Sequence, residues 1–249
     1  MKTFQEKTNK LFRAVVLLSI IGFINMSFSY GQDKSEGVIS YKRIVNLHAS
    51  LSPDQSTMKA MIPELSTTKF NLFYNDSYAR LTEVKKSNMQ GGVMLKTQSE
   101  EKIIDFKNKT TSELYTIMKK NYVVIDKKSD NENDKFKYTG ESKTIAGFLC
   151  KKATLIRNDR KFELWISKDL PINVSPLGNL GIEGVVLEVK FDNVSFIAQE
   201  VKFKKVDTNL FKVPKDYREI TPEQHEDLIE EELEEMQAGG GNVKVIKRH

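Results

Sequence analysis

The chain has 249 residues, with 39 lysines and arginines against 34 aspartates and glutamates, and it contains a single cysteine. One cysteine excludes an intramolecular disulfide, so the fold must depend on a hydrophobic core, for which the chain is long enough. The basic residues are spread singly along the sequence and form no compact cluster with interleaved aromatic residues. This excludes the usual signature of a nucleic-acid-binding protein.

The first 31 residues are typical of a signal peptide. Four basic residues precede an apolar run over Ala14–Met26, which is short for a membrane-spanning helix. Small residues at Ser29 and Gly31 predict cleavage before Gln32, and an uncleaved N-terminal anchor is the alternative. The rest of the chain has no second long apolar stretch. We therefore expect an exported protein that is periplasmic or outer-membrane-associated and at most peripheral to the membrane.

Alternation of apolar and polar residues dominates the chain after residue 36 and predicts a mainly β fold. In the segment GVISYKRIVN, Ile39, Tyr41 and Val45 are expected on one face, with lysine and arginine on the other. Ten or eleven strands are expected, at 37–46, 68–74, 78–84, 102–106, 110–117, 121–126, 135–142, 148–156, 161–167, 184–191 and 195–206. Short polar turns at 75–77, 107–109, 158–159 and 192–193 join them, so we predict an antiparallel meander.

Three other segments interrupt the strands. SPDQSTMKAMIPEL predicts a short helix that crosses the sheet, because Met58, Met61 and Ile62 recur at helical spacing. The polar stretch 127–135 reads as a loop, and GNLGIEG at 178–184 reads as a flexible loop with turn glycines, since no Lys-Ser/Thr pair follows it.

An acidic helix is expected at the end of the chain. Thr221 has the character of an N-cap, Pro222 suits the first helical position, and Gln224 completes a capping box. The helix should be exposed and partly frayed, either docked on its own sheet or free to bind a partner. The predicted organisation is a signal peptide over 1–31, a β domain over 32–221, and a helix with a loose basic tail over 222–249.

Motifs for chemistry are scarce. His48, His225 and His249 have no metal-ligand spacing, and His225 is expected on a solvated helix face. There is no Gly-x-Ser-x-Gly nucleophile motif. Cys150 is interpreted as a small buried hydrophobic residue, with a reactive thiol as the alternative. We expect no cofactor and no catalytic or metal site.

The stretch TIAGFLCKKATLIRNDRKFELWISKDLP resembles a recurring unit of secreted envelope proteins of Gram-negative bacteria, the GLPGLI-signature family and its neighbours. The matching residues are Thr144, Ile145, Gly147, Phe148, Cys150, Lys152, Ala153, Trp165, Ser167, Asp169, Leu170 and Pro171. The resemblance implies a single curved antiparallel sheet with one or two helices packed against it, a half-barrel similar to the LolA/LolB lipoprotein carriers, whose concave face can hold an acyl chain. It carries no catalytic residue onto this chain.

These observations predict a non-enzymatic, exported binding module that holds a lipid or another apolar ligand. The apolar face assigned to that ligand comprises Phe70, Leu72, Leu164, Ile166, Leu187 and Val189. The same residues could instead simply form the core. A second hypothesis is a non-catalytic accessory or scaffold for an outer-membrane partner. The third, and least favoured, is a hydrolase whose site is assembled from residues distant in sequence.

Overall fold

The computed structural model describes residues 33–52, 55–84, 101–127, 136–157, 159–178 and 180–238. The expected signal peptide, nearly all of the 127–135 loop and the basic tail after residue 238 lie outside these ranges. The chain divides into two units, Met1–Asp33 and Lys34–His249, and the strands and helices of the described ranges all lie in the second.

Twelve strands, three short helices and one longer C-terminal helix make up the described part of the chain. The strands are β1 Gly37–Asn46, β2 Leu65–Tyr74, β3 Tyr78–Glu83, β4 Glu101–Asp105, β5 Thr110–Ile117, β6 Lys120–Lys127, β7 Lys137–Ile145, β8 Phe148–Arg157, β9 Arg160–Ser167, β10 Val185–Phe191, β11 Val194–Phe203 and β12 Arg218–Ile220. The helices are η1 His48–Ser50, α2 Ser56–Met61, η3 Thr208–Phe211 and α3 Pro222–Ala238. The prediction of a mainly β protein with a C-terminal helix is confirmed.

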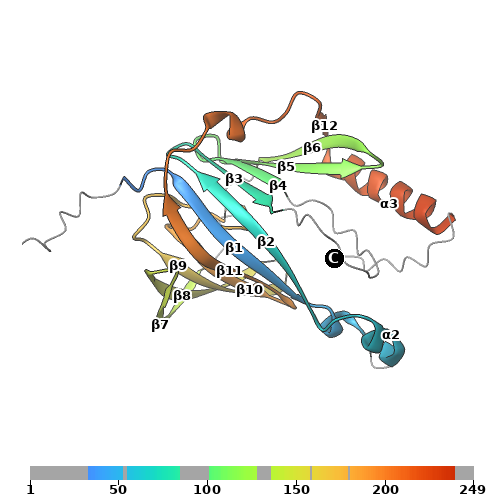
Figure 1. The fold of residues 1–249 in the computed structure, drawn as a ribbon, viewed down its shortest axis with the longest axis horizontal. Coiled ribbons are helices and arrows are strands. Elements are labelled where there is room, and N and C mark those ends of the chain that lie inside the picture. The colour runs from blue at the N-terminus through green and yellow to red at the C-terminus, as the bar shows by residue number, and fades with distance from the viewer. Residues whose placement is uncertain are drawn as a thin grey trace, which may run out of the picture. The chain divides into compact units, whose positions relative to one another are not determined.

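All twelve strands belong to one sheet, in the order β12-β6-β5-β4-β3-β2-β1-β11-β10-β9-β8-β7 (Figure 1). Strands β1 to β6 form one antiparallel meander and β7 to β11 form another, and the pairing of β1 with β11 joins the two. The expected sequential hairpins are thus confirmed within each meander. The expectation of a purely antiparallel sheet is wrong, because β12 returns to the far edge and pairs in parallel with β6.

The predicted turns are found where the strands end. Asn75 Oδ1 accepts hydrogen bonds from the backbone amides of Ser77 and Tyr78, at 2.9 and 2.8 Å, and so closes the β2–β3 turn. Asp159 and Asp192 adopt positive φ angles of 57° and 46° in the β8–β9 and β10–β11 turns. Aspartate tolerates this left-handed conformation better than most residues, which is why these two positions make tight turns.

A β-bulge interrupts the simple alternation of β10, which would place Val185, Leu187 and Val189 on one side. The pairing with β9 shifts between Val186 and Glu188, so that Val186 lies opposite Ile166 and Val189 lies opposite Leu164. Leu187 is the additional residue at this shift. Because a bulge inserts one residue into the two-residue period, Val185 and Val189 do not share a face.

Arg43 of β1 is another departure from the predicted pattern. Its side chain was expected on the solvent face, yet only 4% of the residue is exposed. The guanidinium lies 5.1 Å from the ring centroid of Phe70 on the neighbouring strand. Arg43 has the same parity as Ile39 and Tyr41, so the pleat places all three on one face.

The helix α2 does not cross the sheet. It lies in the β1–β2 connection at the end of that hairpin (Figure 1), and Met61, expected to pack on the sheet, is 74% exposed. Helical spacing alone therefore predicted the helix correctly but not its position. A helix of six residues has too little apolar surface to determine its own docking.

The C-terminal helix begins as predicted. The backbone amide of Gln224 donates to Thr221 Oγ1 at 3.2 Å. In return, the side-chain oxygen Oε1 of Gln224 accepts from the backbone amide of Thr221 at 3.0 Å, which completes a capping box. Helix α3 docks on its own sheet: Leu228 and Ile229 pack against a small cluster of buried residues from β5, β6 and β12. That cluster comprises Ile117, Tyr122, Val124 and Ile220.

Candidate functional site

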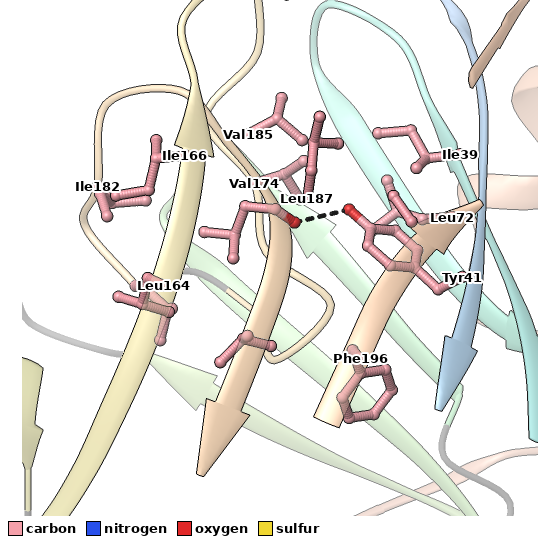
Figure 2. Close-up of a cluster of buried hydrophobic side chains, with 14 of the residues drawn as sticks. Ile39, Tyr41, Leu72, Leu164, Ile166, Val174, Ile182, Val185, Leu187 and Phe196 are labelled. Carbon is pink, nitrogen blue, oxygen red and sulfur yellow. Dashed lines mark hydrogen bonds between the residues drawn. The ribbon is translucent and has the colours of Figure 1, made fainter. Parts of the chain in front are cut away.

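The six residues assigned to an apolar ligand come together in the main hydrophobic cluster. They lie on β2, β9 and β10, and four of them, Leu72, Leu164, Ile166 and Leu187, are labelled in Figure 2. Each is between 0 and 3% exposed, so their side chains are closed off from solvent. The alternative interpretation, in which these residues form a packed core, requires this burial. A role of the six residues in ligand binding stays a prediction.

The connection between β9 and β10, residues 168–184, contributes to the same cluster. Its buried apolar side chains are Leu170, Ile172, Val174, Leu180 and Ile182. The glycine-rich part of this connection was expected to be a flexible loop. The signal that could have corrected this is its own period-two spacing of apolar residues, which marks a segment with one buried face.

Buried polar groups also lie within this cluster, among them the Tyr41 hydroxyl and the Cys150 thiol. The Tyr41 hydroxyl donates a hydrogen bond of 2.8 Å to the Val186 carbonyl, which links β1 to β10 (Figure 2). Cys150 is a fully buried free thiol, and burial raises its pKa to about 11. A thiol with this pKa stays protonated at neutral pH and is a poor nucleophile, so the interpretation of Cys150 as a buried residue is confirmed.

A charged surface surrounds the chain's single tryptophan on the opposite face of β8, β9 and β10. Strand register places Lys152 and Glu188 directly beside Trp165, one on each neighbouring strand. The Lys143 ammonium of β7 lies 4.1 Å from the centroid of the Trp165 ring, and that of Lys152 lies 5.8 Å away. We call this group, with the carboxylates paired to it, the Trp165 surface.

Cross-strand ion pairs hold the lysines of the Trp165 surface. Lys143 contacts Glu188 at 2.7 Å, while Lys152 contacts Glu141 at 3.2 Å and Glu163 at 3.7 Å. The hydrogen bond between Lys152 and Glu141 raises the pKa of the lysine and lowers that of the glutamate, so both stay charged. The sequence drew attention to Trp165 and Lys152 separately but not to the group, because only the register of four strands brings it together.

A second polar group lies where α3 meets β5. The His225 ring centroid is 4.1 Å from that of Tyr115, whose hydroxyl donates a hydrogen bond to the Glu113 carboxylate. Glu113 also accepts from the Lys102 ammonium at 2.7 Å. We call these four residues the His225 cluster. The expectation of a fully solvated His225 is wrong, because the ring is covered by the strand on which the helix docks.

The imidazole of the His225 cluster is neutral at physiological pH. Burial, the largest influence, lowers the pKa of His225, although the nearby carboxylates of Glu113 and Glu226 oppose that shift. Its Nε2 atom is buried without a hydrogen-bond partner among the described residues. The cluster therefore holds a neutral nitrogen base beside a tyrosine and a glutamate.

No metal site is formed by the part of the chain that the structure describes, where histidine, cysteine and carboxylate side chains nowhere gather in groups of three or more suited to an ion. His48 does not belong to the His225 cluster; its Nε2 lies 3.0 Å from the Ile62 carbonyl oxygen. Among the described helices, none has the length and apolar character needed to cross a membrane.

Comparison with known proteins identifies relatives of this fold. A family model described as "N-glycanase peptide, N-terminal domain" matches residues 65–222. Two crystal forms of PNGF-II, in space groups C2 and P21, resemble the chain with TM-scores of 0.56 and 0.55 at 20% sequence identity. They cover 79 and 80% of this chain, whereas the chain spans only 33 and 34% of theirs. No curated protein sequence matches the chain.

These findings correct several expectations drawn from the sequence. The resemblance to the GLPGLI-signature and LolA/LolB-like proteins is wrong, because the matching family model is that of the N-glycanase N-terminal domain and the similar solved structures are of PNGF-II. The interpretations as a non-enzymatic lipid-binding module or an outer-membrane scaffold, with a lipid or an envelope protein as partner, are overturned by the same match. The residues around Cys150 and Trp165 form the β8–β9 hairpin, and a hairpin by itself does not identify a family.

The matched region runs from the start of β2 to the first residue of α3 and covers more than half of the chain, so this protein belongs to the family of the N-glycanase N-terminal domain.

Proposed function

We propose that this chain acts in the removal of N-linked glycans from glycoproteins, and that it supplies a domain that contacts the glycoprotein substrate. The observation that carries the proposal is the family match over residues 65–222. The similarity to PNGF-II supports the same fold but covers only about a third of that protein, so activity is inferred from the family and not from the neighbours.

We also propose that the chain is exported, with residues 1–31 as the signal peptide, 32–221 as the β domain and 222–249 as an acidic helix and tail. The basic and apolar segments at the start of the sequence support export. N-terminal sequencing of the protein recovered from outside the cytoplasmic membrane should begin at Gln32. Recovery of uncleaved chain from the cytoplasm would contradict this proposal.

A half-barrel curvature of the sheet is the third part of the proposal. Its support is that residues from the two meanders approach one another. Arg157 of β8 lies within electrostatic reach of Asp126 of β6, and a Cβ at Gly178 would lie 3.5 Å from Thr111 of β5. Cysteines introduced together at positions 126 and 157 should therefore cross-link with a short bifunctional reagent, which a flat sheet would prevent.

The function is tested with the full mature chain and one glycoprotein in two forms, with its N-glycans present and with them removed. We expect selective binding to the glycosylated form, measured by surface plasmon resonance, and we expect mass spectrometry to detect released glycan. Equal binding to both forms together with no glycan release, on folded and on unfolded glycoprotein, would overturn the proposal.

A further inference from the structure

We propose that the Trp165 surface is a carbohydrate-binding site that contacts a sugar ring of the N-glycan. This inference rests on the proposed function for the substrate class, and on the geometry of β7 to β10 for the site. Trp165 packs against the edge of the main hydrophobic cluster. Its neighbours across the strands are Lys152 and Glu188, whereas Leu164 and Ile166 alternate to the other face of β9.

The chemistry of the surface matches that of a sugar. A pyranose ring has an apolar face of C–H groups and a rim of hydroxyls that both donate and accept hydrogen bonds. Trp165 is a partly exposed residue, and an indole ring has a flat apolar face. Carboxylates of Glu188 and Glu163 and the ammonium of Lys152 stand around it, and each carboxylate can accept more bonds than its ion pair uses.

The charge balance of the surface favours an uncharged ligand. Three lysines, Lys143, Lys152 and Lys161, are paired with three glutamates, Glu141, Glu163 and Glu188. A phosphate or nucleic-acid ligand would require an excess of positive charge, which is absent from this group. A neutral oligosaccharide requires only fixed donors and acceptors, and cross-strand ion pairs hold these groups in place.

Lys143 is the residue that must adjust when a sugar binds. Its ammonium lies over the face of the Trp165 ring. However, the Lys143 side chain is 38% exposed, and β7 is an edge strand of the sheet. An exposed cation–π contact contributes only about a few-fold to an equilibrium constant, so a sugar face can replace it. The displaced ammonium remains within reach of the hydroxyls of that sugar.

The single tryptophan makes the test site-specific. We would titrate the mature protein with a free N-linked core oligosaccharide and follow tryptophan fluorescence and its quenching by acrylamide. Because Trp165 is the only tryptophan, a saturable change with protection from the quencher reports occupancy at this surface. No binding up to millimolar oligosaccharide, or binding without any effect on fluorescence, would overturn the inference.

Variants of the surface are compared by calorimetric titration with the same oligosaccharide. Trp165→Ala and Glu188→Ala should weaken binding about tenfold or more, with Trp165→Phe intermediate because it keeps an aromatic ring. Tyr138→Ser is the matched control, since this aromatic residue is 49% exposed on β7 but lies opposite Ala153, not opposite Lys152.

Two failures are distinguishable in this design. If the oligosaccharide and the glycoprotein bind with unchanged affinity to Trp165→Ala and Glu188→Ala, the carbohydrate site lies elsewhere and the proposed function stands. If neither the oligosaccharide nor the glycoprotein binds to the unaltered protein, both the site and the proposed function are wrong. Far-UV circular dichroism of each variant confirms that the comparison is made on folded protein.

Discussion

Gly184 has a backbone conformation that other residues cannot adopt without strain. Its φ angle is +109°, and a Cβ there would collide with the Ser167 carbonyl oxygen and approach Ile166 Cγ2 at 3.1 Å. Its amide also donates to Asn173 Oδ1 at 2.8 Å, which fixes the entry into β10. The requirement for glycine here is therefore both conformational and steric.

We predict that Gly184→Ala lowers the free energy of unfolding by about 1–3 kcal/mol. Gly140→Ala is the control, because Gly140 also has a positive φ but a Cβ there would meet nothing within 4 Å. Urea denaturation of both variants measures the difference. An equal loss in the two would show that the backbone angle alone matters and that the collision with Ser167 is relieved.

The thiol of Cys150 should be unreactive in the folded protein. Its sulfur is buried and its pKa is raised to about 11 by burial, so both access and thiolate fraction are low. At about pH 8, Ellman's reagent should label the native protein very slowly and the urea-unfolded protein completely. Rapid labelling of native protein would revive the reactive-thiol alternative.

At the scale of single elements, the N-terminus of α3 is stabilised by the capping box between Thr221 and Gln224. Thr221→Ala removes the side-chain acceptor and should destabilise the docked helix by about 1 kcal/mol. Thermal melting followed by far-UV circular dichroism measures this effect. Glu231→Gln, an exposed change on the same helix, should leave the melting curve nearly unaltered.

The docking of α3 should depend on pH through His225. Burial lowers its pKa in the folded state below the value of 6.5 expected in the unfolded chain, so the unfolded state binds the proton more readily. The contribution of the neutral His225 to the free energy of unfolding is thus fully present above about pH 6.5. It is lost as the pH falls below that value toward the folded-state pKa. The charged groups near the ring, Glu113 and Glu226, reduce this effect without reversing it.

Urea midpoints measured between about pH 7 and pH 5 test that dependence. The decline in stability over this interval should be smaller in His225→Gln, which cannot titrate. An identical decline in the variant and the unaltered protein would mean that other groups, and not His225, are responsible.

At the scale of the whole described sheet, the two meanders share one hydrophobic cluster. Leu72 lies on the first meander and Leu164 on the second, and both are fully buried in that cluster. Tyr41 adds a hydrogen bond between β1 and β10 across the junction. We therefore expect β1 to β11 to unfold as one cooperative unit.

Leu72→Ala and Leu164→Ala should each lower the free energy of unfolding by about 2–5 kcal/mol. Fluorescence of Trp165 reports on the unfolding of the second meander, and far-UV circular dichroism reports on the unfolding of the whole sheet. The two unfolding curves should coincide for both variants. Ile156→Ala, at a residue that is 68% exposed, serves as the control. A Leu72→Ala protein in which only the circular dichroism curve shifts would show that the meanders unfold separately.

The candidate site was only partly accessible to sequence analysis. The strand that carries Trp165 was predicted correctly at 161–167, because alternation along one strand is a local property. The Trp165 neighbours Lys143 and Glu188 lie on β7 and β10, and their approach depends on three strand registers that the sequence does not display. The same holds for His225 and Tyr115, which meet only when α3 docks on β5.

The sequence by itself determined the strands from β1 to β11, the aspartate and asparagine turns and the capped start of α3, since each depends on interactions between residues a few positions apart. Only the tertiary structure decided that β1 pairs with β11 and that β12 forms a strand parallel to β6. The physical reason is that long-range pairing is selected by the combined burial of many apolar side chains, and no short window of sequence contains that sum.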